Sequence, residues 1–125
     1  MANVPESKGI KHDTNKPNLA LIPIEAIWAL GESLTYGAKK YGDDNFREGL
    51  AVRRQLSAAI RHVYQALEQE DVDADSNCLH LGNAMASIAM AIYTIKHNPE
   101  FDNRYFKVKE RELNEIARLK GHENE

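Results

Sequence analysis

The sequence contains very little cysteine and no long apolar run. Its single cysteine, Cys78, excludes an internal disulfide and has no Cys-x-x-Cys partner for zinc or redox chemistry. The polar amino terminus carries no apolar run of signal-peptide length, and the longest apolar stretch, residues 84–92, is far shorter than a membrane span. We therefore expect a cytoplasmic protein that is neither exported nor inserted into a membrane.

An excess of basic charge is also missing. The 16 Lys+Arg residues are dispersed and face 19 Asp+Glu residues, which gives a net charge of −3. Duplex nucleic acid is therefore not an expected partner. The chain has no P-loop, no Gly-x-Ser-x-Gly motif and no paired His/Cys set, which argues against P-loop transfer, serine hydrolysis and zinc catalysis.

Apolar residues do recur at intervals of three and four, which is the spacing of amphipathic helices. The 125 residues suffice for one compact domain. We predict a single domain over residues 1–125, with an extended lead-in over 1–22, a core of three helices over 23–97, and a charged helix and tail over 98–125. No segment reads as a convincing strand. The expected fold is an all-α helical bundle with a peripheral C-terminal helix.

The third core helix is apolar on nearly every side. A helix of this kind is normally buried all round, and so small a chain covers it most easily with another copy of itself. We therefore expect a homo-oligomer.

Between the second and third helices lies an acidic turn, Glu68 to Asp75, in which carboxylates alternate with other residues. It imitates the start of a calcium-binding loop, but Ser76 stands where that loop needs glycine and Gly82 where it needs a bidentate glutamate. A simple solvated helix end remains an alternative.

The third helix favours a binding site over a solvated helix end. Its residues His80, Asn83 and Ser87 form a polar stripe on an otherwise apolar surface, and buried polar groups need partners. If the two helices pair about a turn near Asp73, His80 comes level with Leu67 and Glu68. Carboxylate, imidazole and amide groups would then meet at one end of the bundle and could hold Mg²⁺ or Mn²⁺. The expected metal ligands are Glu70, Asp71, Asp75 and His80.

His62, on the second helix, is either a catalytic residue or a hydrogen-bonded core histidine. Arg61 beside it suits bidentate binding of phosphate, or else forms a surface ion pair. Lysine-rich segments and Tyr41 offer contacts to an anionic, aromatic ligand, and the alternative for Tyr41, which the pattern favours, is the end of a helix in the core. The expected catalytic residues are Glu70, Asp71 and His62, and the expected substrate-binding residues are Lys11, Asp13, Lys16, Lys40, Tyr41, Asn45, Arg61 and Asn83.

Three ordered motifs carry a family resemblance. "KHDTNKPNLALIPIE", "YGAKKYGDDNF" and "RHVYQALEQEDVDADSNCLHLGNA" resemble the phage and prophage proteins named for a dATP/dGTP diphosphohydrolase amino-terminal domain, with Phe46 where that family has tryptophan. The resemblance implies a MazG-like fold and activity, meaning all-α nucleoside triphosphate pyrophosphohydrolases that work as dimers or tetramers with Mg²⁺.

The implied function is phage-type hydrolysis of a purine deoxynucleotide, dATP or dGTP, to the monophosphate and pyrophosphate in the host cytoplasm. The alternative is a non-catalytic oligomer that binds or sequesters a nucleotide or a nucleotide-derived signal. It stays open because the chain lacks the Glu-Glu-x-x-Glu and Glu-x-x-Asp strings of MazG enzymes.

Overall fold

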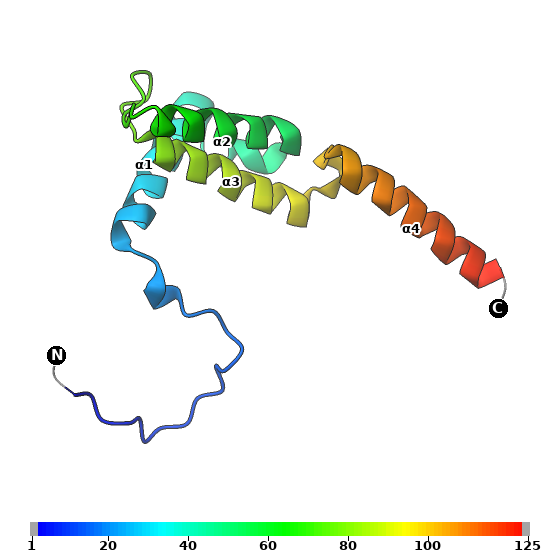
Figure 1. The fold of residues 1–125 in the computed structure, drawn as a ribbon, viewed down its shortest axis with the longest axis horizontal. Helices are drawn as coiled ribbons and strands as arrows, with labels where there is room; N and C mark the ends of the chain where they lie inside the picture. Colours follow the sequence, from blue (N-terminus) through cyan, green and yellow to red (C-terminus); the bar gives the residue numbers. More distant parts are fainter. Residues whose placement is uncertain (1–2, 124–125) are drawn as a thin grey trace.

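The computed structural model describes residues 3–123, and its regular elements are all helical (Figure 1). Within that range the only pairing of extended backbone is one isolated bridge between Val72 and Leu79. The prediction of an all-α fold is confirmed. The α-helices are α1 (Ile24–Tyr41), α2 (Val52–Leu67), α3 (His80–His97) and α4 (Tyr105–Glu123), and the short 3₁₀ turns are η1 (Leu19–Leu21), η2 (Asn45–Glu48) and η3 (Pro99–Phe101).

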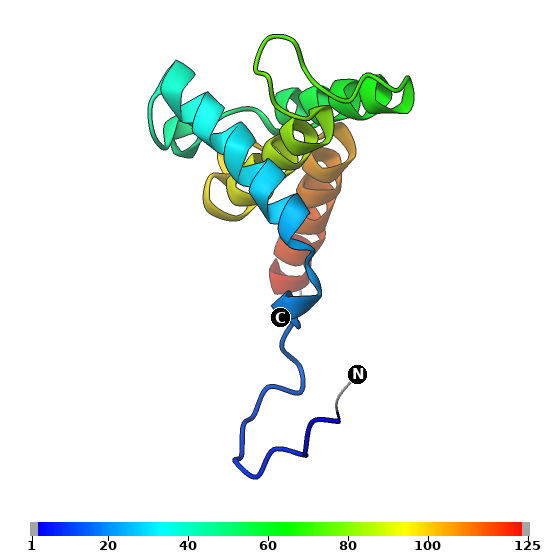
Figure 2. The same cartoon turned by 90° about the vertical axis from the view of Figure 1, so that its left-hand side faces the viewer.

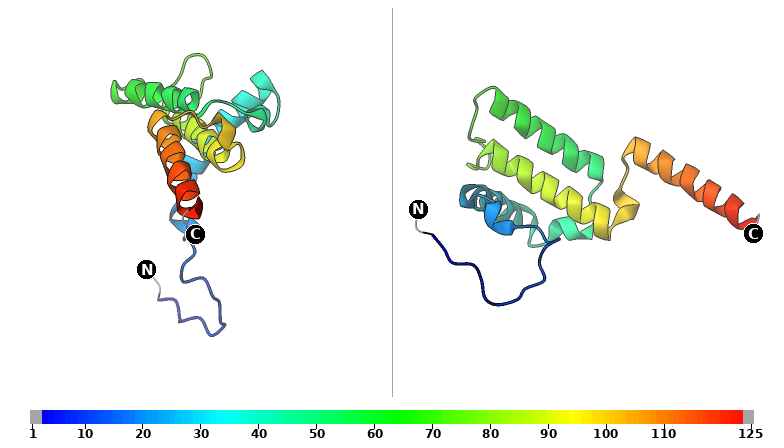
Figure 3. Two further views of the ribbon diagram at one scale, coloured as in Figure 1. Left: turned by 90° about the vertical axis from the view of Figure 1, so that its right-hand side faces the viewer. Right: turned by 60° about the horizontal axis from the view of Figure 1, so that its bottom comes forward.

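Helix α3 is the centre of the fold. It lies beside α2 as a helical hairpin (Figure 3), and α1 crosses it obliquely (Figure 2). Gly42 ends α1. Its φ of 93° is readily adopted only by glycine, and its N–H donates to the Ala38 carbonyl at 2.8 Å. The chain then passes through η2 to α2. As a result, α1 and α2 rest on the same central helix.

The crossing of α1 and α3 depends on Gly82. A Cβ atom at this position would lie 2.8 Å from the Ala29 carbonyl oxygen and 2.9 Å from Ser33 Oγ. Only a residue without a side chain lets the two backbones approach this closely. Gly82 thus fixes where α1 meets α3.

Small and polar side chains fill the interior of the chain. The fully buried set has Val52 as its one large aliphatic member, together with His80 and Thr94. Large apolar side chains lie mostly outside, including Trp28 at 69% and Ile92 at 60% exposure. One chain therefore leaves much of its apolar surface in water, which is unusual for a stable monomer.

Helix α4 runs away from the other helices (Figure 1) and is tied to them at its start. The buried carboxylate of Asp102 accepts hydrogen bonds from Arg104 and Arg111, both at 2.7 Å. The Arg104 bonds hold the pKa of Asp102 down to about 2. Next to it, Asn103 Oδ1 accepts the Arg53 N–H and so caps the start of α2. The last helix is peripheral, as predicted.

Residues 3–18 are exposed throughout and extend away from the helices (Figure 1). Among the described helices, none combines the length and the hydropathy needed to cross a membrane.

We predict that Gly82→Ala lowers the free energy of unfolding by about 1–3 kcal/mol, because the added methyl group forces α1 away from α3. Gly31→Ala in α1 is the matched control, since a Cβ there meets nothing within 4 Å. The control should gain up to about 1 kcal/mol from helix propensity. Urea unfolding of both variants measures the difference, and a Gly82 variant as stable as the control would contradict the packing argument.

Candidate functional site

The acidic segment after α2 folds back over the end of the hairpin. Its turn is closed by the Asp73 N–H donating to the Cys78 carbonyl, while the His80 N–H donates to the Asp71 carbonyl, both at 2.8 Å. Because the loop returns along α2, His80 meets His62, more than one helical turn before Leu67. The predicted pairing of His80 with Leu67 and Glu68 is therefore wrong.

Two histidines form the centre of this end of the hairpin. His62 Nδ1 and His80 Nδ1 are 2.9 Å apart, and the His80 side chain is almost wholly buried. The pKa of His62 lies below its ordinary value, chiefly because burial disfavours its charged form and secondarily because His80 is close. The charged form of His62 is therefore disfavoured. Glu70 lies on the far side of His80, with its Oε1 3.6 Å from His80 Nε2.

Asp73 brings a carboxylate to the histidine pair. Ligand atoms of His62, Asp73 and His80 all lie within 4.8 Å of one another. The carboxylate is held in place, since its Oδ1 accepts the Asp75 N–H and its Oδ2 accepts from Asn83 Nδ2 at 3.1 Å. We call His62, Asp73 and His80 the hairpin-end cluster.

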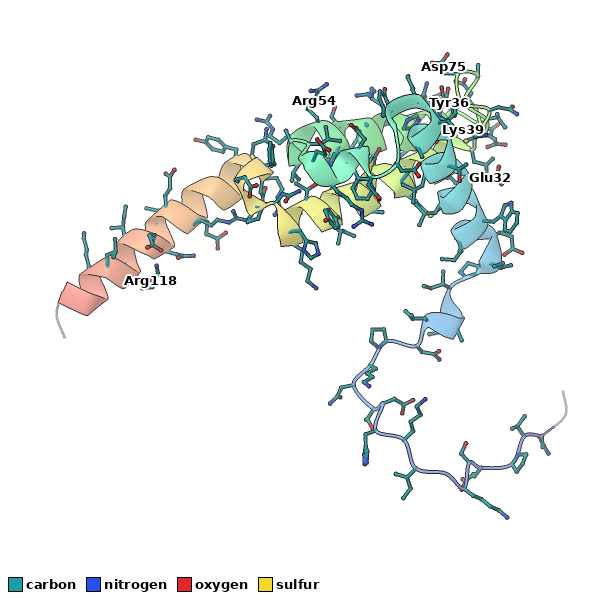
Figure 4. The ribbon with its side chains drawn as sticks, turned by 180° about the vertical axis from the view of Figure 1, so that it is seen from behind. Glu32, Tyr36, Lys39, Arg54, Asp75 and Arg118 are labelled. Atoms are coloured by element: carbon teal, nitrogen blue, oxygen red, sulfur yellow. The ribbon has the colours of Figure 1, made fainter. Side chains whose placement is uncertain are left out.

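Asp75 lies on the side of the loop that faces α1. Its backbone carbonyl accepts from the Tyr36 hydroxyl at 3.4 Å, and Figure 4 shows it near Tyr36 and Lys39. A hollow of about 600 Å³ separates α1 from the loop here. Asp71 is exposed, and its contribution to the site is the backbone carbonyl that accepts from His80. Ligand roles for Asp71 and Asp75 stay predictions.

A groove of about 810 Å³ runs between α1 and α2, with Ala86, Ser87 and Met90 of α3 among its lining residues. It also adjoins η2, where Phe46 packs edge to face on Tyr93. This volume is in the usual range for small-molecule sites. Three of the predicted substrate-binding residues line it, namely Tyr41, Asn45 and Arg61.

Arginines give the groove its positive charge. Arg47, Arg54 and Arg61 all line it, and Arg47 is paired with Asp44 at 2.7 Å. Within residues 3–123, Arg54 and Arg61 form no ion pair with a carboxylate. Figure 4 shows Arg54 projecting from α2. Two cations without acidic partners suit an anionic ligand such as a phosphate chain.

A buried amide also needs a partner in the groove. Thr94 Oγ1 donates to the Met90 carbonyl at 2.9 Å, so toward Gln55 it can only accept, at 3.3 Å from Gln55 Nε2. Gln55 Oε1 is then left buried with no hydrogen-bond donor among the described residues, as is Ser33 Oγ. Both residues line the groove. A ligand bound there that offers hydrogen-bond donors could therefore satisfy these two buried oxygens.

The other predicted substrate-binding residues lie outside the groove lining. Lys40 Nζ is 5.2 Å from the Tyr41 ring centroid, and the pKa of Lys40 is raised chiefly by its hydrogen bond with Tyr41. Asn83 is occupied by Asp73 and Ser76. The exposed lead-in carries the remaining three, and the structure does not bring it to the groove (Figure 1). These three are Lys11, Asp13 and Lys16.

Sequence reasoning missed the roles of Asp73, Gln55 and Arg54. A signal for part of this set is present, because Gln55 and His62 are seven residues apart on α2, as are His80, Ser87 and Thr94 on α3. Polar residues at this spacing share one face of a helix and predict a polar seam between α2 and α3. No comparable pattern distinguishes Asp73 from the other loop carboxylates.

Comparison with known proteins identifies relatives. The model of a family described as dATP/dGTP diphosphohydrolase, N-terminal, matches residues 6–104. A "dATP/dGTP diphosphohydrolase" of Salmonella phage PMBT28 is 30% identical over 96 residues, which cover 77% of this chain and 33% of that relative. The match therefore spans about a third of the relative's length. No solved structure matches the chain significantly.

We predict that Arg54→Ala and Arg61→Ala each weaken binding of tripolyphosphate about tenfold, because each removes a charge-assisted contact of about 1.5–3 kcal/mol. Arg53→Ala is the matched control, since Arg53 is exposed on the same helix and does not line the groove. Calorimetric titration measures the three affinities. Equal losses in all three variants would mean that the groove is not the anion site.

Proposed function

The chain belongs to the dATP/dGTP diphosphohydrolase amino-terminal family, and we propose that it hydrolyses dATP or dGTP to the monophosphate and pyrophosphate, as MazG-like enzymes do. The proposal is carried by one observation, a groove lined by Arg54 and Arg61, neither of which forms an ion pair with a carboxylate among the described residues. Arg61 of the groove and His62 of the cluster are neighbours on α2. A phosphate chain bound by the arginines would thus have titratable groups close to it.

The base would occupy the groove near Gln55. Its Oε1 requires a donor, and the amino group of adenine or guanine would supply one. Tyr41 lines the same groove and presents an exposed ring on which a base can stack. These features support a purine substrate, which would be met in the cytoplasm of an infected host.

The reaction requires water to attack the α-phosphorus while the bond to the bridging oxygen of the pyrophosphate breaks. The attacking water loses a proton, and pyrophosphate leaves with the electron pair of the broken bond. Glu70 is the proposed general base, because its carboxylate is 55% exposed and lies next to His80. Arg54 and Arg61 would stabilise the negative charge on the phosphates.

A divalent ion, Mg²⁺ or Mn²⁺, is part of the proposal, and its charge would help to neutralise the phosphates. Two imidazoles and one carboxylate converge at the hairpin end. Mg²⁺ prefers an all-oxygen shell, whereas Mn²⁺ accepts imidazole, so these residues fit Mn²⁺ better.

We expect the protein to release pyrophosphate from dATP or dGTP and to leave dTTP largely intact. Glu70→Gln should lower kcat about 100-fold or more while nucleotide binding survives, because a general base acts mainly in the transition state. Glu68→Gln, an exposed carboxylate two residues earlier, is the control. Tight binding of a purine nucleotide that stays uncleaved would instead support the alternative of a sequestering protein.

We propose further that the protein is a homo-oligomer, because α3 exposes Leu81, Ile88 and Ile92 and α2 exposes a parallel stripe that includes Ile60 and Leu67. A second copy would remove this apolar surface from water.

Light scattering should accordingly give a mass above the 14.1 kDa of one chain. Ile92→Gln should shift the equilibrium toward the monomer, because it removes apolar area from the expected interface. Lys96→Gln, exposed one turn further along α3, should not. A wild-type protein that is monomeric at micromolar concentration would contradict this proposal.

A further inference from the structure

The two histidines of the hairpin-end cluster cannot satisfy all their nitrogens with protein partners. A neutral imidazole carries one N–H and one lone pair. If His80 Nδ1 donates to His62, then His80 Nε2 is a buried lone pair facing the acceptor Glu70. If His80 Nδ1 instead accepts a hydrogen bond from His62, then His80 Nε2 carries the hydrogen. Glu70 Oε1 is 3.6 Å from that nitrogen, which is too far for a hydrogen bond. Among the described residues His80 Nε2 has no hydrogen-bond partner, although His80 is 1% exposed.

An ion between the two rings would take the place of the contact between their Nδ1 atoms. Both Nδ1 lone pairs would point at it, and His80 Nε2 would carry the hydrogen of the ring, with Glu70 Oε1 at 3.6 Å. A carboxylate behind a metal-binding histidine is the usual second partner of such a ring. Two donors about 2.1 Å from one ion and at a right angle are about 3 Å apart. The observed Nδ1 to Nδ1 separation is 2.9 Å.

Asp73 completes the set with an oxygen. Its carboxylate is oriented by Asn83 and by the Asp75 N–H before any ion arrives. The three ligands come from three segments of the chain, since His62 lies on α2, Asp73 in the loop and His80 at the start of α3. An ion held by all three would fasten the loop to both helices.

We propose that His62, Asp73 and His80 form a binding site for one octahedral divalent transition-metal ion, such as Mn²⁺ or Co²⁺, in preference to Mg²⁺. The two-nitrogen, one-oxygen donor set selects against Mg²⁺, and the near right angle between the imidazoles favours octahedral over tetrahedral coordination. Three protein ligands leave positions for water or a phosphate oxygen. Glu70, the proposed general base, faces His80 Nε2 on the side of the ring away from this ion and is not itself a ligand.

The test is calorimetric titration of the chelator-treated full chain with Mn²⁺, Co²⁺ and Mg²⁺, with no nucleotide present. We expect one Co²⁺ or Mn²⁺ per chain and at least about 100-fold weaker binding of Mg²⁺. His62→Ala and Asp73→Asn should each weaken Co²⁺ binding about tenfold or more. Glu68→Gln, an exposed carboxylate at the start of the same acidic turn, is the matched control and should leave it unchanged.

Circular dichroism of each variant verifies that the helices are retained, and the half-buried His62 is chosen because replacing the buried His80 endangers folding. Three results would overturn the inference. They are wild-type protein that binds no transition metal, equal affinities for Mg²⁺ and Co²⁺, and equal losses of Co²⁺ affinity in the Glu68 and Asp73 variants. The inference does not rest on hydrolysis. A chain that binds Co²⁺ but cleaves no nucleotide refutes the proposed activity alone, and a His62→Ala chain that binds Co²⁺ as tightly as the wild type refutes the site alone.

Discussion

The close approach of three helices through small and polar side chains is the constraint on which this structure depends. Gly82 lets α1 touch the backbone of α3, and alanines at 84, 86 and 91 line the buried side of α3. Because small residues occupy the contacts, the large apolar side chains are displaced to the outer faces. The small size of these contact residues also leaves α1 and α2 separated by a groove over α3. The groove and the exposed apolar surface thus have one origin.

The polar seam between α2 and α3 has a similar double effect. Gln55 contacts Thr94 at one end of the seam, and His62 contacts His80 at the other. Hydrogen bonds, which depend on direction, therefore align the two helices. Leucines at these positions would bury more apolar surface but would not fix the alignment in this way. Each pair leaves one buried polar atom that has no hydrogen-bond partner among the described residues. One of these atoms belongs to Gln55, which lines the groove, and the other belongs to His80 of the hairpin-end cluster. The polar residues between α2 and α3 therefore supply both parts of the candidate site.

The sequence predicts the helices well and the site only in part. Periodicity places the three core helices, and Gly42 marks the end of α1 because few other residues adopt its backbone angle. Helical spacing also finds the polar positions on α3. It does not say that Ile27 and Tyr41 would lie 46% and 63% exposed, since a single chain offers them no cover. The path of a loop of irregular backbone has no periodicity, so neither the His62–His80 contact nor Asp73 follows from spacing.

Helix α1 joins two exposed features of the molecule. Its amino-terminal end carries the exposed Ile24 and Trp28, and its carboxyl-terminal end forms one wall of the groove up to Tyr41. Gly82 meets α1 between these two ends, beside Ala29 and Ser33. A substitution that shifts α1 at Gly82 would therefore alter both the apolar surface at Trp28 and the shape of the groove.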